Sequence, residues 1–169
     1  MSCENKQKDI DDATKRLILE EEARNIESYL SQGGKMRAKL LSPLMLRFYA
    51  DTIYSEFPRS LYVEFYNDSS RVETELGALY GKYFEILNKV YLRDSVIVFN
   101  VKGDTLRCPE MWWDQELQKF YNDTTWQLDS KSGTHLKGHS GFEASQDLRT
   151  IMFKHPRGVF PVADSVISN

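Results

Sequence analysis

The clearest pattern along the chain is an alternation of apolar and polar residues between positions 61 and 66. Leu61, Val63 and Phe65 fall on one side of an extended chain, and polar or amphipathic residues fall on the other. A period of two predicts a β-strand with one buried face, and we expect this strand near a sheet edge. A second run, at 95–101, is apolar on both sides and rich in β-branched residues, which predicts a central strand covered on both faces.

The segment between these two runs has the spacing of a helix. Ser70 and Glu73 form a capping-box pattern, which predicts a helix beginning at Arg71. Seven apolar residues then recur every three or four positions, namely Val72, Leu76, Leu79, Tyr80, Tyr83, Leu87 and Val90. Because a helical crossover normally joins parallel strands, the two strands and this helix predict a right-handed βαβ unit.

Two further helices are predicted before the first strand. One begins at Asp11 or Asp12 and runs to about Gln32, where two glycines follow. Its narrow apolar seam consists of Leu19, Ala23, Ile26 and Leu30. The other begins at Ser42 and Pro43, which suit the N-cap and the first helical position, and runs to about Phe57.

Beyond the second strand, the sequence predicts a short antiparallel return at 105–107 and a helix from Glu110 to about Tyr121, opened by Pro109. Residues 124–128 alternate polar and apolar side chains, as a further strand would. From 129 to 141 the chain is rich in Ser, Gly, Lys and His, which indicates a mobile loop.

Together these elements predict an α/β protein, with α+β as the alternative. The expected fold has two layers, with helices packed against a small mixed sheet that contains the βαβ unit, preceded by two N-terminal helices. At 169 residues the chain can bury one sizeable core. We expect a flexible leader at 1–9, a single domain at 10–128, and a loop-rich segment at 129–169 that lies on the domain.

Composition and charge narrow the class of protein. Hydrophobic residues make up 41% and charged residues 28%, which is usual for globular domains. The net charge of −3 means that any nucleic-acid contact would have to be a local patch. Only Cys3 and Cys108 are present, so no disulfide framework is expected. Without a visible signal peptide or membrane span, we expect a soluble intracellular protein, cytoplasmic or nuclear, with no membrane contact.

No catalytic pattern is complete. Residues 138–142 approach the Gly-x-Ser-x-Gly motif, but Phe142 stands where the last glycine is required. His135 and His139 are four residues apart, yet Leu136 replaces the glutamate that the zinc-protease pattern needs. A loose metal site that adds His155 and Glu143 to these two histidines is a minor alternative. We therefore expect no catalytic residues, no metal and no cofactor, and we favour a non-enzymatic protein.

Seven residues are candidates for partner binding. Trp112 would share a polar helix face with Glu116 and Lys119, and Trp is enriched among interface hot spots. Gly77 and Gly81 would form a stripe of small residues, for which packing within the chain is the favoured explanation and a partner helix the functional one. Two residues on the seam of the first helix, Leu19 and Ile26, would bind a partner groove or lie on the protein's own domain.

These observations favour a protein–protein interaction subunit or adaptor of an intracellular complex, which uses its helical surfaces to bind other subunits or a second copy of itself. One alternative is an RNA-binding module that uses Tyr62 and Tyr66 near Arg59. A second is a small hydrolase or transferase whose histidine-containing loop closes over a pocket. Small α/β folds serve all three classes, so the fold alone does not choose among them.

Overall fold

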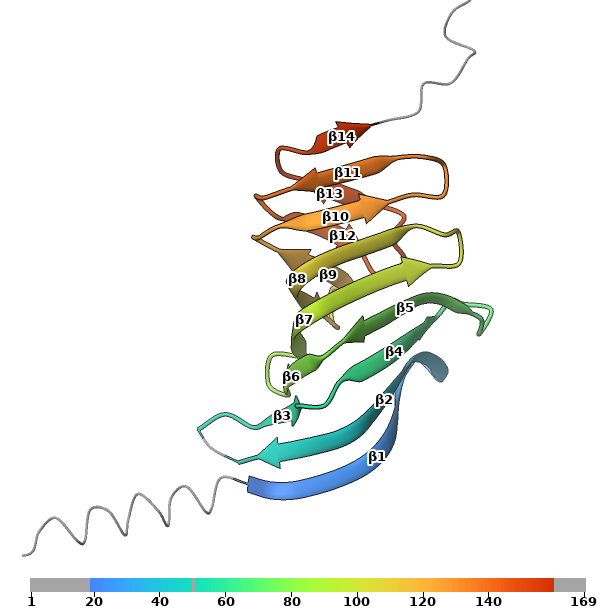
Figure 1. Cartoon of the computed structure of the whole chain (residues 1–169). Helices are drawn as coiled ribbons and strands as arrows, with labels where there is room; N and C mark the ends of the chain where they lie inside the picture. Colours follow the sequence, from blue (N-terminus) through green and yellow to red (C-terminus); the bar gives the residue numbers. More distant parts are fainter. Residues whose placement is uncertain (1–18, 50, 160–169) are drawn as a thin grey trace, which may run out of the picture.

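The computed structural model describes residues 19–49 and 51–159, and within them the protein is entirely built of β-strands. Fourteen strands form one sheet in which every pairing is antiparallel, and none of the described residues is helical (Figure 1). The predictions of an α/β or α+β fold, a mixed sheet, a βαβ unit and packed helices are therefore wrong. The predicted leader at 1–9 and the helix start at Asp11 or Asp12 lie outside the described residues.

The strands follow one another with short connections. In chain order they are β1 (Leu19–Gln32), β2 (Lys35–Phe48), β3 (Tyr54–Phe57), β4 (Leu61–Tyr66), β5 (Val72–Ala78), β6 (Tyr80–Phe84), β7 (Lys89–Asn100), β8 (Thr105–Asp114), β9 (Lys119–Asn122), β10 (Trp126–Asp129), β11 (His135–Gly138), β12 (Phe142–Ser145), β13 (Ile151–Phe153) and β14 (Arg157–Val159).

Three long strands change neighbours along their length, which divides the sheet into two walls. β2 pairs with β4 in its first half and with β3 in its second. β7 pairs first with β6 and then with β5, and β8 pairs first with β10 and then with β9. We call β4, β5, β10, β11 and β14 the first wall, and β3, β6, β9, β12 and β13 the second wall.

A crease of irregular backbone separates the two walls. On β7 the register shifts between Arg93 and Val96, and the residues between them, Asp94 and Ser95, have φ angles of 64° and 56°. Hydrogen bonds continue the crease across neighbouring strands. Ser60 N donates to Leu79 O at 2.9 Å, and Leu79 N donates to Asp94 O at 3.0 Å. The crease lets one continuous sheet fold back on itself.

The hydrophobic core lies between the facing walls. Phe65 on β4 of the first wall meets Trp113 on β8 and Phe120 on β9, with ring centroids 4.9 and 5.6 Å apart. Val63 and Leu76, also on the first wall, are fully buried. Burying a side chain of this size contributes about 1.5–3 kcal/mol, so packing between the walls is what holds the sheet folded.

The segments predicted as strands lie largely in strands of the structure, whereas none of the described residues in the segments predicted as helices is helical. Residues 61–66 form β4, and Leu61, Val63 and Phe65 are its buried side. However, β4 lies between β2 and β5, so the expectation that it lies at an edge is wrong. The run at 95–101 falls mainly in β7, in the middle of the sheet as predicted. The returns at 105–107 and 124–128 correspond to the start of β8 and to most of β10.

The segment predicted as a helix from Arg71 forms β5, β6 and the start of β7 instead. The side of the chain that is buried changes between these strands. Thr74, Leu76 and Ala78 face the core with a strand period of two. The crease at Leu79 and the turn at 85–88 then shift that phase before Val90 resumes it. Two period-two runs that are offset in this way produce the spacing of three and four that suggested a helix.

The apparent helix signals at the other predicted helices are turn and crease residues. Ser42 is buried at the crease, where its hydroxyl donates to Ser60 O at 2.7 Å. Ser70 lies in the β4–β5 turn with a φ of 58°. Pro109 is an exposed residue within β8, beside the crease. Such residue types favour turns and strand irregularities as well as helix caps.

The C-terminal region contains more strand than the sequence indicated. Within 129–159, the strands β11 to β14 belong to the same sheet as the rest of the chain. The segment expected to be a mobile loop includes β11, which pairs with β10 and β14. Its turn is closed by Ser130 N, which donates to Thr134 O at 2.8 Å.

Candidate functional site

The first candidate surface is the free edge of β1. This strand is 14 residues long and, among the described residues, pairs only with β2. It contains neither proline nor lysine, two residues that natural proteins use to protect sheet edges. The side chains of Tyr29 and Leu30 are 52% and 39% exposed. β1 therefore presents a long row of backbone donors and acceptors beside exposed apolar side chains.

The opposite end of the sheet offers much less edge. There the walls end in β13 and β14, each three residues long (Figure 1). Short edge strands give little length for pairing with another chain. The two ends of the sheet therefore differ, and β1 is the better candidate for strand pairing.

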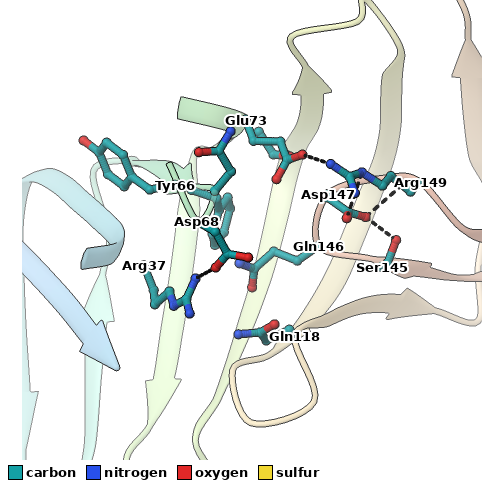
Figure 2. A pocket seen from close by; sticks show the side chains of 12 residues that line it. Arg37, Tyr66, Asp68, Glu73, Gln118, Ser145, Gln146, Asp147 and Arg149 are labelled. Carbon is teal, nitrogen blue, oxygen red and sulfur yellow. Dashed lines mark hydrogen bonds and ion pairs between the residues drawn. The ribbon is translucent and has the colours of Figure 1, made fainter. Parts of the chain in front are cut away.

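The second candidate is a polar pocket of about 250 Å³ at the mouth between the walls (Figure 2). On the side of the first wall, Arg37, Asp68 and Glu73 line it. On the side of the second wall, the β12–β13 turn contributes Asp147 and Arg149. The hairpin turns at the two rims therefore supply most of its charged groups.

Ion pairs organise this pocket and connect the walls. Arg37 Nη1 lies 2.7 Å from Asp68 Oδ1 within the first wall. Arg149 Nη2 lies 2.8 Å from Glu73 Oε1, so this pair joins the β12–β13 turn to β5 (Figure 2). The hydrogen bond and charge of Arg37 hold the pKa of Asp68 below its ordinary value. Asp68 is therefore ionised at neutral pH.

Two polar atoms in the pocket lining are buried without a partner among the described residues. They are Thr74 Oγ1 and Arg37 Nε. Thr74 is only 1% exposed, and a buried hydroxyl without a hydrogen bond is costly. The lining includes neither histidine nor cysteine, and its polar groups are hydroxyls, carboxylates, amides and two guanidinium groups. The pocket can hold a polar group.

An apolar cavity of about 340 Å³ lies between the walls on the side of β1. Ile26, Leu40, Met45 and Phe57 are among its lining residues. Trp113 also lines the cavity, and its indole N–H donates to Gln146 Oε1 at 3.0 Å. Because Gln146 lines the polar pocket, Trp113 connects the two.

Three of the predicted partner-binding residues lie on β8, on β9 and in the turn between these strands. Trp112 lies on β8 and faces away from the core, and its ring is 5.8 Å from Phe84 and 5.1 Å from Tyr91. Lys119 lies on the neighbouring strand β9, on the same outer face, and forms an ion pair with Glu143. Glu116 is exposed in the turn between these strands. The surface is a sheet face, so the predicted helix face is wrong.

The structure does not bring the other four candidates to that surface. Gly77 lies on β5 and Gly81 on β6, in different walls, so they form no common stripe of small residues. A Cβ atom at Gly81 would lie 2.7 Å from Leu61 Cδ2, which explains this glycine by packing within the chain. Leu19 and Ile26 lie on β1, and Ile26 lines the apolar cavity.

The two tyrosines on which the RNA-binding alternative depends lie beside carboxylates. Tyr62 donates to Glu75, and Tyr66 donates to Glu64 at 2.8 Å. Burial and the bond to Glu75 raise the pKa of Tyr62 well above its ordinary value. A carboxylate therefore accepts a hydrogen bond from the hydroxyl of each tyrosine, where RNA binding would require basic groups.

The histidines are dispersed. His135 Nδ1 lies 2.8 Å from Asp129 Oδ1 on the outer face of the first wall, while His139 and His155 lie in two different connections near the crease. In the part of the chain that the structure describes, no three His, Cys, Asp or Glu residues are grouped to hold a metal ion. Cys108 is a buried free thiol, and burial followed by the nearby charge of Glu110 raises its pKa to about 12.

No protein family model matches the chain, and no curated protein sequence matches it significantly. Within the described residues there is no helix long and apolar enough to cross a membrane.

Proposed function

We propose that this protein is a non-catalytic interaction subunit that binds a partner protein by adding one of the partner's strands to the free edge of β1. The observation that carries this proposal is the length of β1 together with its single neighbour among the described residues. In strand addition, main-chain hydrogen bonds supply affinity and alternate side chains supply specificity.

The side chains of β1 indicate what kind of strand would fit. Glu21, Glu22 and Glu27 are exposed, and Tyr29 and Leu30 follow near the end of the strand. Opposite charges across a strand pair stabilise it, whereas like charges destabilise it. The proposed partner strand therefore carries basic residues opposite the glutamates and an apolar residue opposite Tyr29 or Leu30.

A photo-crosslinking amino acid at Ser28 tests the proposal in cells of the native source. Ser28 is exposed on β1, and the matched control position is Lys102, which is exposed in the β7–β8 turn. The proposal predicts one or a few protein adducts from Ser28 that are absent from Lys102. Equal labelling from both positions would contradict a specific edge.

Two proline variants then test whether the main chain carries the binding. Neighbouring residues of a strand point their N–H groups to opposite sides. One of Ser28→Pro and Tyr29→Pro therefore removes a bond to β2, and the other removes only an outward donor. The variant that removes only the outward donor is the one whose melting temperature is nearly unchanged, and this variant should lose the crosslinked partner. Retention of the partner by that variant would reject strand addition.

We also propose a second candidate function, the binding of an amphipathic small molecule between the walls. It is supported by the apolar cavity beside Ile26 and Met45 and by the polar pocket at the mouth. Ligand sites commonly combine an apolar cavity with a few polar groups. A fluorescent fatty-acid analogue should bind, and Met45→Trp, which fills the cavity, should weaken it about tenfold. An unchanged affinity in that variant would exclude this cavity.

A further inference from the structure

The outer surface of the sheet carries a row of positively charged residues at the end opposite β1. Arg107 on β8 is paired in register with Gln127 on β10, and Gln127 is paired with Lys137 on β11. Lys137 in turn lies directly opposite Arg157 on β14. Since residues directly opposite each other point to the same face, the three cations form one line across four neighbouring strands.

Little within the described chain neutralises this row. Arg107 lies 2.9 Å from Asp129. Lys137 and Arg157 are both exposed, and within residues 19–49 and 51–159 neither side chain forms an ion pair or a hydrogen bond. Like charges directly opposite each other destabilise a strand pair. An acidic ligand would remove that repulsion, and the protein's net charge of −3 makes this patch an exception to its overall charge.

A groove of about 580 Å³ along the crease is lined by two of these cations, Arg107 and Lys137, whereas Arg157 lies outside its lining. Arg107, Gln127, Lys137 and His139 supply its polar side chains, and Ile97 and Pro109 supply apolar surface. None of the residues that line it is an aspartate or a glutamate. The groove therefore combines positive charge with apolar contact, and the neighbouring carboxylate of Asp129 is held by Arg107 at 2.9 Å and by Gln127 at 2.8 Å.

We propose that this basic groove docks an extended acidic segment of a partner protein, with apolar residues between its carboxylates. The charge of the row supplies the attraction, and Ile97 and Pro109 contact the apolar residues. Arg107 and Lys137 are two strands apart, which is about 9.6 Å at the usual strand spacing. Every third residue of a polyproline II segment lies on one side, about 9.3 Å apart, so carboxylates at that interval match the two cations.

The alternative polyanions fit the groove less well. A single-stranded nucleic acid uses aromatic platforms for its bases, and the aromatic residue of the lining, Trp126, is only 3% exposed. A membrane surface is broad and flat, whereas these contacts lie in a groove. The proposal does not depend on strand addition at β1, because the groove lies at the other end of the sheet.

A labelled peptide of Glu-Pro-Pro repeats tests the proposal by fluorescence anisotropy on the full chain. The matched peptide has glutamine in place of glutamate, which keeps the backbone and removes the charge. The proposal predicts that only the glutamate peptide binds, and that added salt weakens its binding. Equal binding of both peptides, or binding of neither, would overturn it.

The variant Lys137→Glu separates binding from folding. It replaces the like-charged pair with Arg157 by an opposite-charged pair, so the melting temperature should rise while peptide affinity falls at least about tenfold. The control Lys102→Glu makes the same change in net charge at an exposed turn and should keep the peptide. Equal loss of affinity in both variants would overturn the groove assignment. Displacement of the peptide by a single-stranded oligonucleotide or by anionic vesicles that bind more tightly would overturn the choice of partner.

Discussion

Thr74 shows at the residue scale how the interior of this protein departs from simple core packing. It lies on the buried side of β5 next to Leu76, and its methyl group suits that position. Its hydroxyl is buried in the lining of the polar pocket and lacks a partner among the described residues. Burying this hydroxyl without a hydrogen bond lowers the stability of the protein, and a ligand that bonds to it in the pocket would offset that loss.

Thr74→Val should raise the free energy of unfolding of the isolated protein by about 1 kcal/mol, because it removes an unbonded buried hydroxyl while keeping the shape of the side chain. Chemical denaturation measures this change. The control Thr125→Val, at an exposed position, should have little effect. A loss of stability in the Thr74 variant would show that the hydroxyl has a partner.

Trp112 and Trp113 are neighbours in sequence with opposite environments. Trp113 is 2% exposed in the core, whereas Trp112 is half-buried against two aromatic rings on the outer face. Trp113→Ala should therefore cost about 3–5 kcal/mol, and Trp112→Ala about 1–2 kcal/mol. Urea unfolding of the two variants compares them directly. Equal losses would mean that another segment covers Trp112, and would remove the case for a partner there.

Asp114 gives the pH dependence that we expect at acidic pH. Burial alone would raise the pKa of its carboxyl, but the bonds from Leu117 N at 2.9 Å and from Lys89 lower that pKa further than burial raises it. A carboxyl whose pKa is lowered by folding stabilises the protein at pH values above its unfolded-state pKa, which is about 3.9. That contribution is lost as pH falls through the folded-state pKa.

The melting temperature should therefore begin to fall below about pH 5 and should continue to fall as pH drops through the lowered folded-state pKa of Asp114. Asp114→Asn should be less stable at neutral pH and should show a shallower fall over this range. A profile as steep as that of the unchanged protein would place the responsible carboxyl elsewhere.

At the scale of elements, the crease is the feature that the sequence least reveals. It depends on backbone irregularities spread over distant positions, such as the register shift on β7 and the positive φ angle of 90° at Ser60. Gly141 stands at the same line, between β11 and β12, with a φ of 87°. A Cβ atom there would lie 2.2 Å from Asn122 O, so the backbone of β9 leaves no room for a side chain.

Gly141→Ala should consequently destabilise the protein by more than the roughly 1 kcal/mol that a positive φ angle costs an alanine. Gly133→Ala is the matched control, because Gly133 has a φ of 94° and nothing within 4 Å of an added Cβ atom. Thermal unfolding of both variants isolates the steric part. Equal destabilisation would mean that the crease can widen at β9.

Strands with an uninterrupted period of two were predictable, and elements that bend or turn were not. Leu61, Val63 and Phe65 alternate without a break, so β4 was found with its buried face. In β1 the seam of Ala23 and Ile26 has a spacing of three because Asn25, with a φ of 49°, bends the strand between them. A spacing of this kind fits a helix equally well, and no local signal separates the two readings.

The candidate surfaces were predictable only in part, for the same reason. Trp112 was identified because a large indole was expected to face away from the inner arc formed by Trp113. The polar pocket joins β2, β5 and the β12–β13 turn, which are far apart in sequence, so its members carry no common motif. The free edge of β1 could have been suspected from Met36, Ala38 and Leu40, whose alternation after Gly33-Gly34 indicates a hairpin.

At the scale of the whole molecule, one folded sheet creates three distinct surfaces. The interior between the walls holds the core, the apolar cavity and the polar pocket. One end exposes the long strand β1, and the other ends in the short strands β13 and β14 (Figure 1). The basic groove lies towards this second end. Within the described residues the sheet is open at β1, which pairs with β2 alone.

Hydrogen exchange along β1 tests the central claim most directly. N–H groups alternate between the two sides of a regular strand, so in the isolated protein alternate amides from Ile26 to Leu30, before the register shift, should exchange quickly while their neighbours, bonded to β2, are protected. Addition of the partner identified by crosslinking at Ser28 should slow the fast set alone. Uniform protection of β1 in the isolated chain, or no change on binding, would contradict the claim that β1 is a free edge that binds another strand.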